Sequence, residues 1–144
     1  MFRRLISTSA TWVPLPLRLA MATIFVAHGA QKGLGSFNGP GFEKWLSFPA
    51  PFGFMKPAWL WLAAAAFSEL IGGILIFLGL LTRLGAFLIA CTMVTALPAR
   101  HWPNFFAPGG IEYPLALVAI SLALLISGGG IASVDLAMSG GRRR

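Results

Sequence analysis

Long apolar segments alternate with shorter, more polar connections along the chain. Four such segments run over about residues 13–32, 57–81, 84–99 and 113–128. A helix of about 20 residues crosses the roughly 30 Å hydrocarbon core of a bilayer, and each segment comes near that length once its interfacial residues are included. The pattern therefore predicts an all-α fold, an integral membrane four-helix bundle, with residues 1–144 forming a single transmembrane domain.

The connections between the predicted spans differ in length. The turn at 79–83 is tight, so the second and third spans are expected to form an antiparallel hairpin. The connections at 33–56 and 100–112 are longer and combine helix-breaking Pro and Gly with many aromatic residues. Because Trp and other aromatic rings are favoured at the membrane interface, we expect these aromatic-rich loops to lie at the outer interface.

The composition agrees with a membrane location. Hydrophobic residues make up 57% of the chain and charged residues only 10%, whereas soluble domains average about 25% charged residues. The net charge of +7 comes from basic residues that stand singly or at the chain ends, which is typical of topology signals. The single cysteine, Cys91, excludes a disulfide framework. The expected partners are the lipid bilayer and a protein partner or a second copy of the chain, with no nucleic acid.

The basic residues also predict an orientation, because membrane proteins keep an excess of Lys and Arg on the cytoplasmic side. With four spans, both termini and the 79–83 turn lie on the side that holds more basic residues. Both termini are therefore predicted to be cytoplasmic. That side holds Arg3, Arg4, Arg83 and Arg142–Arg144, and the other side holds Lys32, Lys44, Lys56 and Arg100.

A small set of ionisable and polar residues lies within the predicted spans or at their ends. A charge inside a span costs about 2.5–3.5 kcal/mol on insertion scales, so such residues usually face the bundle interior and find partners. We interpret the set as a candidate polar or ligand-binding cluster. It consists either of structural partners that hold the helices in register, or of a proton relay or ligand site at the outer mouth. Its members are Arg18, His28, Lys32, Glu69, Glu112 and Tyr113.

Depth along the helices indicates how these residues pair. Counted at about 1.5 Å per residue, Arg18 lies near the cytoplasmic side and Glu69 near the midplane. Arg18 is therefore expected to reach toward Glu69 or to extend back to the lipid headgroups. A separate outer cluster is expected to contain His28, Gln31, Glu112 and Tyr113.

Other site chemistries have less support in the sequence. His28 and His101 could ligate a haem, or a metal together with Glu112, but His101 stands in the proline-containing connection at 100–112. Cys91 is interpreted as a small packing residue. Phosphate loops, catalytic triads, zinc motifs and dinucleotide fingerprints are absent from the sequence. We expect no metal and no cofactor other than a quinone, and the residues leave enzymatic activity open; a catalytic role would be that of an oxidoreductase subunit.

Five stretches follow one another between residues 17 and 135: RLAMATIFVAHGAQKGLG, GPGFEKW, SELIGGILIFLGLLTRLGA, IEYPLALVAISLALLISGGG and SVD. In this order they resemble the DoxX family of small bacterial membrane proteins. The resemblance implies a four-helix bundle in the bacterial inner membrane. Residues that match the polar pattern of the family are Arg18, His28, Gly29, Lys32, Glu69, Gly72, Arg83, Glu112 and Asp135.

The resemblance also implies a range of functions. The family is related to the DoxD-like subunit of thiosulfate:quinone oxidoreductase and includes proteins that look like membrane partners of thiol-oxidant defence enzymes. We therefore expect an auxiliary or anchoring subunit of a membrane redox system, quinone-linked or serving oxidant defence. One alternative is a small-solute or proton carrier, indicated by the polar stripe that Arg18, His28 and Lys32 form along one face of the first span. The other is an oxidoreductase subunit that binds quinone directly. The aromatic outer loops over His28, Glu69 and Glu112 are then either a quinone site or an interfacial belt.

Overall fold

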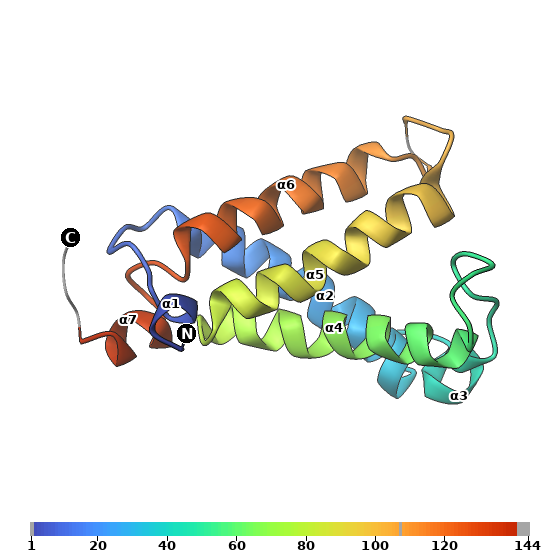
Figure 1. The fold of residues 1–144 in the computed structure, drawn as a ribbon, viewed down its shortest axis with the longest axis horizontal. Helices are drawn as coiled ribbons and strands as arrows, with labels where there is room; N and C mark the ends of the chain where they lie inside the picture. Colours follow the sequence, from blue (N-terminus) through green and yellow to red (C-terminus); the bar gives the residue numbers. More distant parts are fainter. Residues whose placement is uncertain (1, 107, 141–144) are drawn as a thin grey trace.

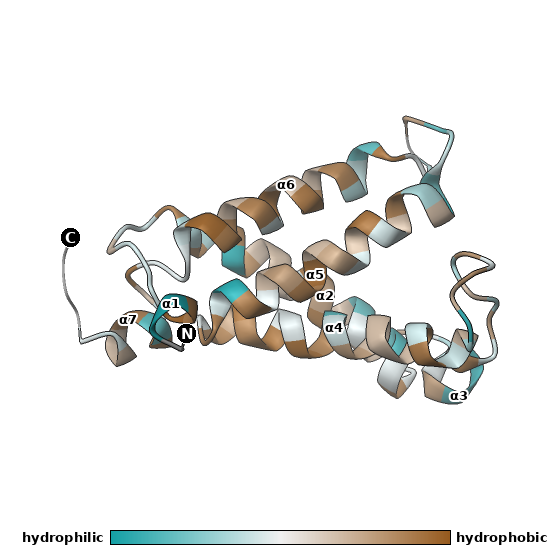
Figure 2. Ribbon diagram, in the orientation of Figure 1, coloured by the Kyte–Doolittle hydropathy of each residue, from teal (hydrophilic) through white to brown (hydrophobic). Residues whose placement is uncertain are grey.

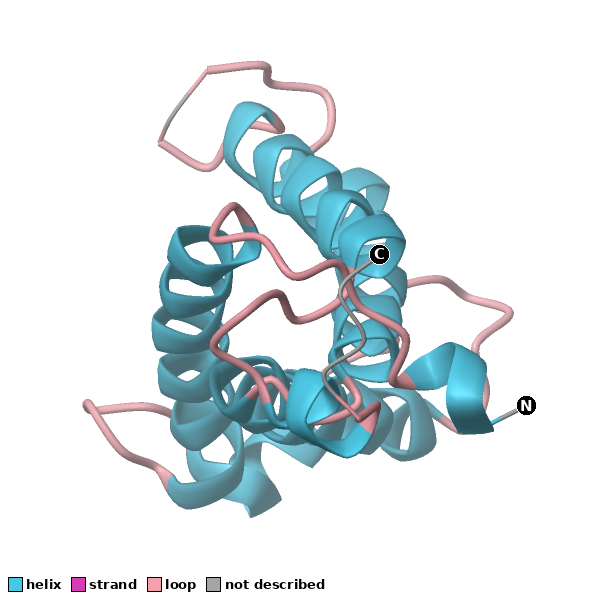
Figure 3. Cartoon of the chain, turned by 90° about the vertical axis from the view of Figure 1, so that its left-hand side faces the viewer, coloured by secondary structure: helices cyan, strands magenta, loops and turns pink. Residues whose placement is uncertain are grey.

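The computed structural model describes residues 2–106 and 108–140, and this part of the chain is helical with no strand (Figures 1 and 3). The longest helices occupy the four segments predicted as spans, whereas three short helices were not predicted. In chain order the elements are α1 (Phe2–Leu5), α2 (Pro14–Leu34), α3 (Gly41–Leu46), α4 (Ala58–Leu78), α5 (Thr82–Ala96), a π-helical turn (Leu97–His101), α6 (Glu112–Ser127) and α7 (Val134–Met138).

The four long helices run alternately up and down (Figure 1). Helix α2 packs along α4, and α5 packs against both α4 and α6, whereas α2 and α6 contact each other less extensively. We call the end where α4 turns into α5 the Arg18 end and the opposite end, where α3 lies, the α3 end. Short helix α3 falls in the predicted outer loop and packs on α2 and α4, so this connection folds onto the helices.

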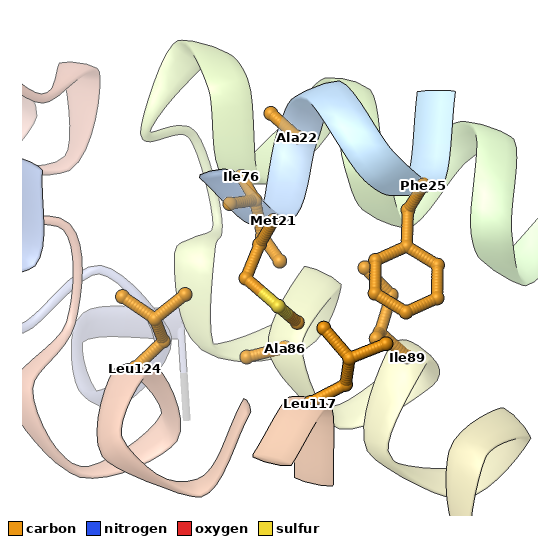
Figure 4. Close-up of a cluster of buried hydrophobic side chains, with 8 residues drawn as sticks. All are labelled: Met21, Ala22, Phe25, Ile76, Ala86, Ile89, Leu117 and Leu124. Carbon is orange, nitrogen blue, oxygen red and sulfur yellow. The ribbon is translucent and has the colours of Figure 1, made fainter. Parts of the chain in front are cut away.

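Apolar side chains from all four long helices form the core (Figure 4). Met21 and Phe25 of α2 point toward Leu117 of α6 and Ile89 of α5, and all four are nearly or completely buried. The cluster fills the interior beside the Arg18 end. Its complete membership is Met21, Ala22, Phe25, Ile76, Ala86, Ile89, Leu117 and Leu124.

Glycines allow two of the helix pairs to approach at backbone distance. A Cβ atom on Gly29 of α2 would lie 2.5 Å from the backbone nitrogen of Leu70 in α4. A Cβ atom on Gly85 of α5 would lie 2.9 Å from the carbonyl oxygen of Gly72 in α4. Small residues at such crossings are typical of membrane helix packing, where close van der Waals contact replaces the hydrophobic effect.

The outward faces of the long helices are apolar. Ala58–Leu78 and the continuous helical stretch Thr82–His101 are long and apolar enough to cross a membrane, and only 33% of the most apolar window of each is buried. Helix α6 is apolar but shorter, at 16 residues. Figure 2 shows brown colouring along much of α5 and α6 and along the half of α4 nearer to α7. Core helices of soluble proteins are mostly buried, so these faces favour contact with lipid.

We expect Gly29→Ala to destabilise the protein, because the added methyl group would collide with the backbone of α4 and force the two helices apart. Overpacking of this kind costs about 1–3 kcal/mol. The matched control is Gly33→Ala on the same helix, where nothing lies within 4 Å of the added carbon. Denaturation in detergent micelles should show a lower midpoint for G29A and an equal or higher one for G33A. Equal midpoints for G29A and the wild type would contradict the close α2–α4 crossing.

Candidate functional site

Arg18 is buried at one end of the helices and is bonded to backbone carbonyl groups. Its Nε atom donates to the oxygen of Ile76 (2.8 Å), and Nη2 donates to that of Phe77 (2.7 Å). Its Nη1 atom donates to Gly129 (2.8 Å) and Ala132 (2.6 Å) in the segment after α6. The guanidinium group therefore caps the last turn of α4, whose carbonyls have no partner within the helix.

Two further charged residues at the Arg18 end also satisfy helix termini. The carboxylate of Asp135 accepts hydrogen bonds from the backbone nitrogens of Leu81 (2.7 Å) and Thr82 (2.9 Å), at the start of α5. Arg83 donates to the carbonyl oxygens of Leu125 and Ile126, both at 2.8 Å, near the end of α6. We call Arg18, Arg83 and Asp135 the capping residues. Their hydrogen bonds stabilise the helix ends at the Arg18 end, which is a structural role.

We expect Arg18→Gln to lower the free energy of unfolding by several kcal/mol, because each buried acceptor left without a donor costs about 1–3 kcal/mol. Unfolding by SDS titration in mixed micelles measures the change. Arg3→Gln is the matched control, since Arg3 is exposed. The effects of R18Q and E69Q should add within about 0.5 kcal/mol, as expected for residues that share no partner. A large coupling energy between the two would contradict the assignment of Arg18 to the carbonyl groups.

A cavity of about 380 Å³ lies in the other half of the molecule, toward the α3 end. All four long helices contribute to its wall, together with Trp45 of α3 and the connection that follows it. Most of the wall is apolar, with alanines on α4 and α5, and the polar groups are few. The polar and titratable residues that line it are His28, Lys32, Ser68, Glu69, Cys91, Thr92, Thr95, Arg100, His101 and Tyr113.

An ion pair between Lys32 of α2 and Glu69 of α4 forms part of the cavity wall. The Glu69 side chain is 2% exposed and that of Lys32 18% exposed. The Lys32 ammonium group also lies 4.9 Å from the ring centre of Trp45, a cation–π distance. The Trp45 indole donates to the carbonyl oxygen of Leu62 on α4 at 2.7 Å. Helix α3 thus positions a ring against the charged side of the cavity.

The comparison with known families covers α2 to α5, the helices that supply most of the cavity wall. A model of the DoxX family matches residues 13–102, more than half of the chain. The chain belongs to the DoxX family. The Bacillus subtilis (strain 168) protein described as "Putative oxidoreductase CatD" is 35% identical to this DoxX protein over 111 residues, which cover 76% of each chain. No solved structure matches the sequence of the chain.

The structure divides the predicted polar cluster of this DoxX protein between two places. His28, Lys32, Glu69 and Tyr113 line the cavity, whereas Arg18 lies at the Arg18 end. The predicted approach of Arg18 to Glu69 is wrong: Lys32 pairs with Glu69, and the arginine neither reaches it nor extends outward. The physical reason is that the carbonyl groups at the end of α4 lie within hydrogen-bond distance of Arg18 and accept its donors.

Two residues of the predicted outer cluster, His28 and Tyr113, line the same cavity. Gln31 and Glu112 are not among the residues that line it. Glu112 begins α6 and has an interaction partner of its own. Several side chains of the cavity were outside the predicted cluster, among them Cys91 and Arg100. Trp45 was expected within the aromatic outer loops, as part of either a quinone site or an interfacial belt, and its place over Lys32 depends on the fold of α3.

The histidines do not assemble a metal site. Among the described residues, no group of three or more His, Cys, Asp or Glu side chains could hold a metal ion, so the alternative built on His28, His101 and Glu112 is wrong. His28 and His101 do line the same cavity. The Nδ1 atom of His101 lies 2.9 Å from the carbonyl oxygen of Gly109, a contact that holds the ring against the connection before α6.

We expect Glu69→Gln to destabilise the protein more than the double substitution K32M/E69L. Removing one member of a fully buried ion pair costs about 3–5 kcal/mol because a charge stays buried without its partner, whereas replacing both by apolar groups is often neutral. That range is an upper limit for E69Q, because the Lys32 side chain that keeps its charge is 18% exposed. Thermal unfolding in detergent tests the order. Glu43→Gln on exposed α3 serves as the control and should leave the midpoint unchanged. A double variant less stable than E69Q would contradict this account of the pair.

Proposed function

We propose that this DoxX protein is a multi-pass inner-membrane protein of four spans that serves a membrane redox system by binding a quinone-class head group in the cavity. It acts there as an auxiliary or anchoring subunit, beside a protein that carries the catalytic groups. The observation that carries the proposal is the partly buried Lys32–Glu69 ion pair in the wall of a mostly apolar cavity of about 380 Å³.

The size and lining of the cavity fit such a ligand. Ligand pockets commonly enclose about 300–1,000 Å³ and combine apolar walls with a few polar groups that orient the ligand. A quinone head group is a flat apolar ring that carries two carbonyl acceptors. Lys32 is a donor in the wall, and the hydroxyl group of Tyr113 and the ring of His28 lie on the α6 and α2 sides of the same cavity.

A bound quinone would supply two-electron redox chemistry, and the residues of this chain would bind and orient it. The Lys32 ammonium group can donate to a carbonyl oxygen, and the ion pair with Glu69 holds that ammonium group in place. Trp45 offers a ring face next to the same position. The name of the Bacillus subtilis relative, an oxidoreductase, agrees with a redox role.

Helix composition and charge support the four-span topology. The outward faces of α4, α5 and α6 carry exposed large apolar side chains, among them Phe67, Ile71, Phe87 and Leu122. Helix α2 is 21 residues long, and its arginine is fully bonded to carbonyl groups, which makes burial in a membrane tolerable. The arginines of the Arg18 end support a cytoplasmic location for that end and for both termini; Arg142–Arg144, which also entered this prediction, lie outside the described residues.

The same geometry disfavours a proton or small-solute carrier. That alternative was based on a polar stripe along the first span, from Arg18 to Lys32. The two residues have fixed and unrelated partners, and the buried core of Met21 and Phe25 lies between them on the same helix. The stripe therefore does not form one polar path through α2.

We expect purified protein in lipid nanodiscs to bind decylubiquinone saturably, with quenching of tryptophan fluorescence because Trp45 and Trp61 line the cavity. Ala65→Leu fills the cavity without removing a charge and should weaken binding by tenfold or more. Lys32→Met should have a similar effect because the donor is lost. Absence of saturable quenching in the wild type would rule out the proposed ligand class.

Two matched controls keep the result specific. Ala63→Leu places the same side chain on α4 at a residue that does not line the cavity, and Lys44→Met removes an exposed lysine from α3. Both variants should bind decylubiquinone as the wild type does. Equal affinity in A65L and A63L would place the ligand outside the cavity.

A further inference from the structure

The cavity extends to the flank of the molecule between α4 and α5. Ala64 and Ser68 line it from α4, and Cys91 and Thr95 line it from α5. Ala64 and Cys91 are also exposed on the outer surface. We call these four residues the α4–α5 opening.

The opening follows from the way in which the two helices meet. Near the Arg18 end, α4 and α5 are in backbone contact at Gly72 and Gly85 and are joined by a short turn that Asp135 holds. Away from that end the helices diverge (Figure 1), and the cavity occupies the space between them. The helices are thus fixed at one end and separated at the other.

The side chains of the opening are small and offer few free polar groups. The Thr95 hydroxyl donates to the carbonyl oxygen of Cys91 at 2.9 Å, and the neighbouring Thr92 hydroxyl donates to that of Leu88 at 3.1 Å. Hydroxyl groups bonded within their own helix are compatible with an apolar environment. An alkyl chain could therefore pass between the helices without leaving these hydroxyl groups unpaired.

The opening lies at a depth where the bilayer is hydrocarbon. Cys91 stands nine residues after Thr82, or roughly 14 Å along the helix at about 1.5 Å per residue, in a helical stretch apolar enough to span a membrane. The same stretches of α4 and α5 carry Phe67 and Val94, both more than half exposed. The flank therefore faces lipid chains in the proposed topology.

The α3 end is more obstructed than this flank. Trp45 lies over Lys32 and is bonded to Leu62, and the following connection contributes Pro51 and Met55 to the cavity wall. These residues stand between the ion pair and the outer surface. A ligand arriving from water would have to displace them, whereas one arriving from the bilayer meets only small side chains.

From these contacts we infer that the ligand is a lipid-soluble amphiphile with an apolar tail, which enters from the bilayer through the α4–α5 opening. Its head group lies against the Lys32–Glu69 pair, and its tail extends between Ala64 and Cys91 into the lipid. This inference rests on the proposed function, and it adds the tail and the route to the ligand class.

Chemical modification of Cys91 tests the route in protein that has already folded. The modification is specific to this residue because Cys91 is the only cysteine of the chain. Folded protein in nanodiscs is treated with N-ethylmaleimide, which adds bulk at the opening. Association of decylubiquinone should then slow by tenfold or more, while binding of the tailless 2,3-dimethoxy-5,6-dimethylbenzoquinone should change less than twofold. Both rings are fully substituted and do not add to the thiol. C91A treated in the same way is the control and should keep the untreated rate.

A second variant examines the opposite wall. Ala64→Trp should slow association of decylubiquinone, whereas Ala119→Trp, at an exposed alanine of α6 outside the cavity, should not. If the wild type binds both quinones but neither modified Cys91 nor A64W slows the tailed one, the lateral route is wrong and the proposed function stands. If the wild type binds neither quinone, the proposed function is wrong, and so is this inference, which rests on it.

Discussion

The free carbonyl and amide groups at the ends of the helices are the constraint on which the rest of the structure depends. Where no water is available, each such group needs a partner from the protein. Arg18 serves the end of α4, Arg83 the end of α6, and Asp135 the start of α5. Because these charged side chains come from elements far apart in the sequence, their bonds also fix the helices, the 79–83 turn and the segment after α6 to one another.

Rigid packing at one end leaves the other end free to hold a site. Helices α4 and α5 touch at Gly72 and Gly85 and then diverge, so the space between their distant halves becomes the cavity. The charges follow the same division. Arg18 is used entirely for the backbone, whereas the Lys32–Glu69 pair lies in the cavity wall. Arg18, which stabilises the fold, and Lys32, which belongs to the pair suited to binding, thus lie on one polar stripe of the first span.

Much of the fold could be predicted because hydrophobic length and helix breakers are local properties. The four apolar segments agree with α2, α4, α5 with its π-helical turn, and α6 within a few residues. Helix α3 was not predicted, since six residues between Pro40 and Ser47 carry no periodic signal of their own. The pairing of Arg18 with Glu69 was wrong because an estimate of depth compares side chains only and ignores backbone acceptors, which here receive all of the Arg18 bonds.

The sequence by itself determined the helical class, the positions of the long helices, the membership in the DoxX family and the few polar residues that an apolar chain retains. Only the tertiary structure decided which of these residues meet. Partner choice depends on the rotation and crossing of whole helices, set by contacts such as Gly29 against Leu70. A shift of one helix by a single residue would turn Lys32 away from Glu69 by about 100°, so the ion pair and the cavity exist only through packing.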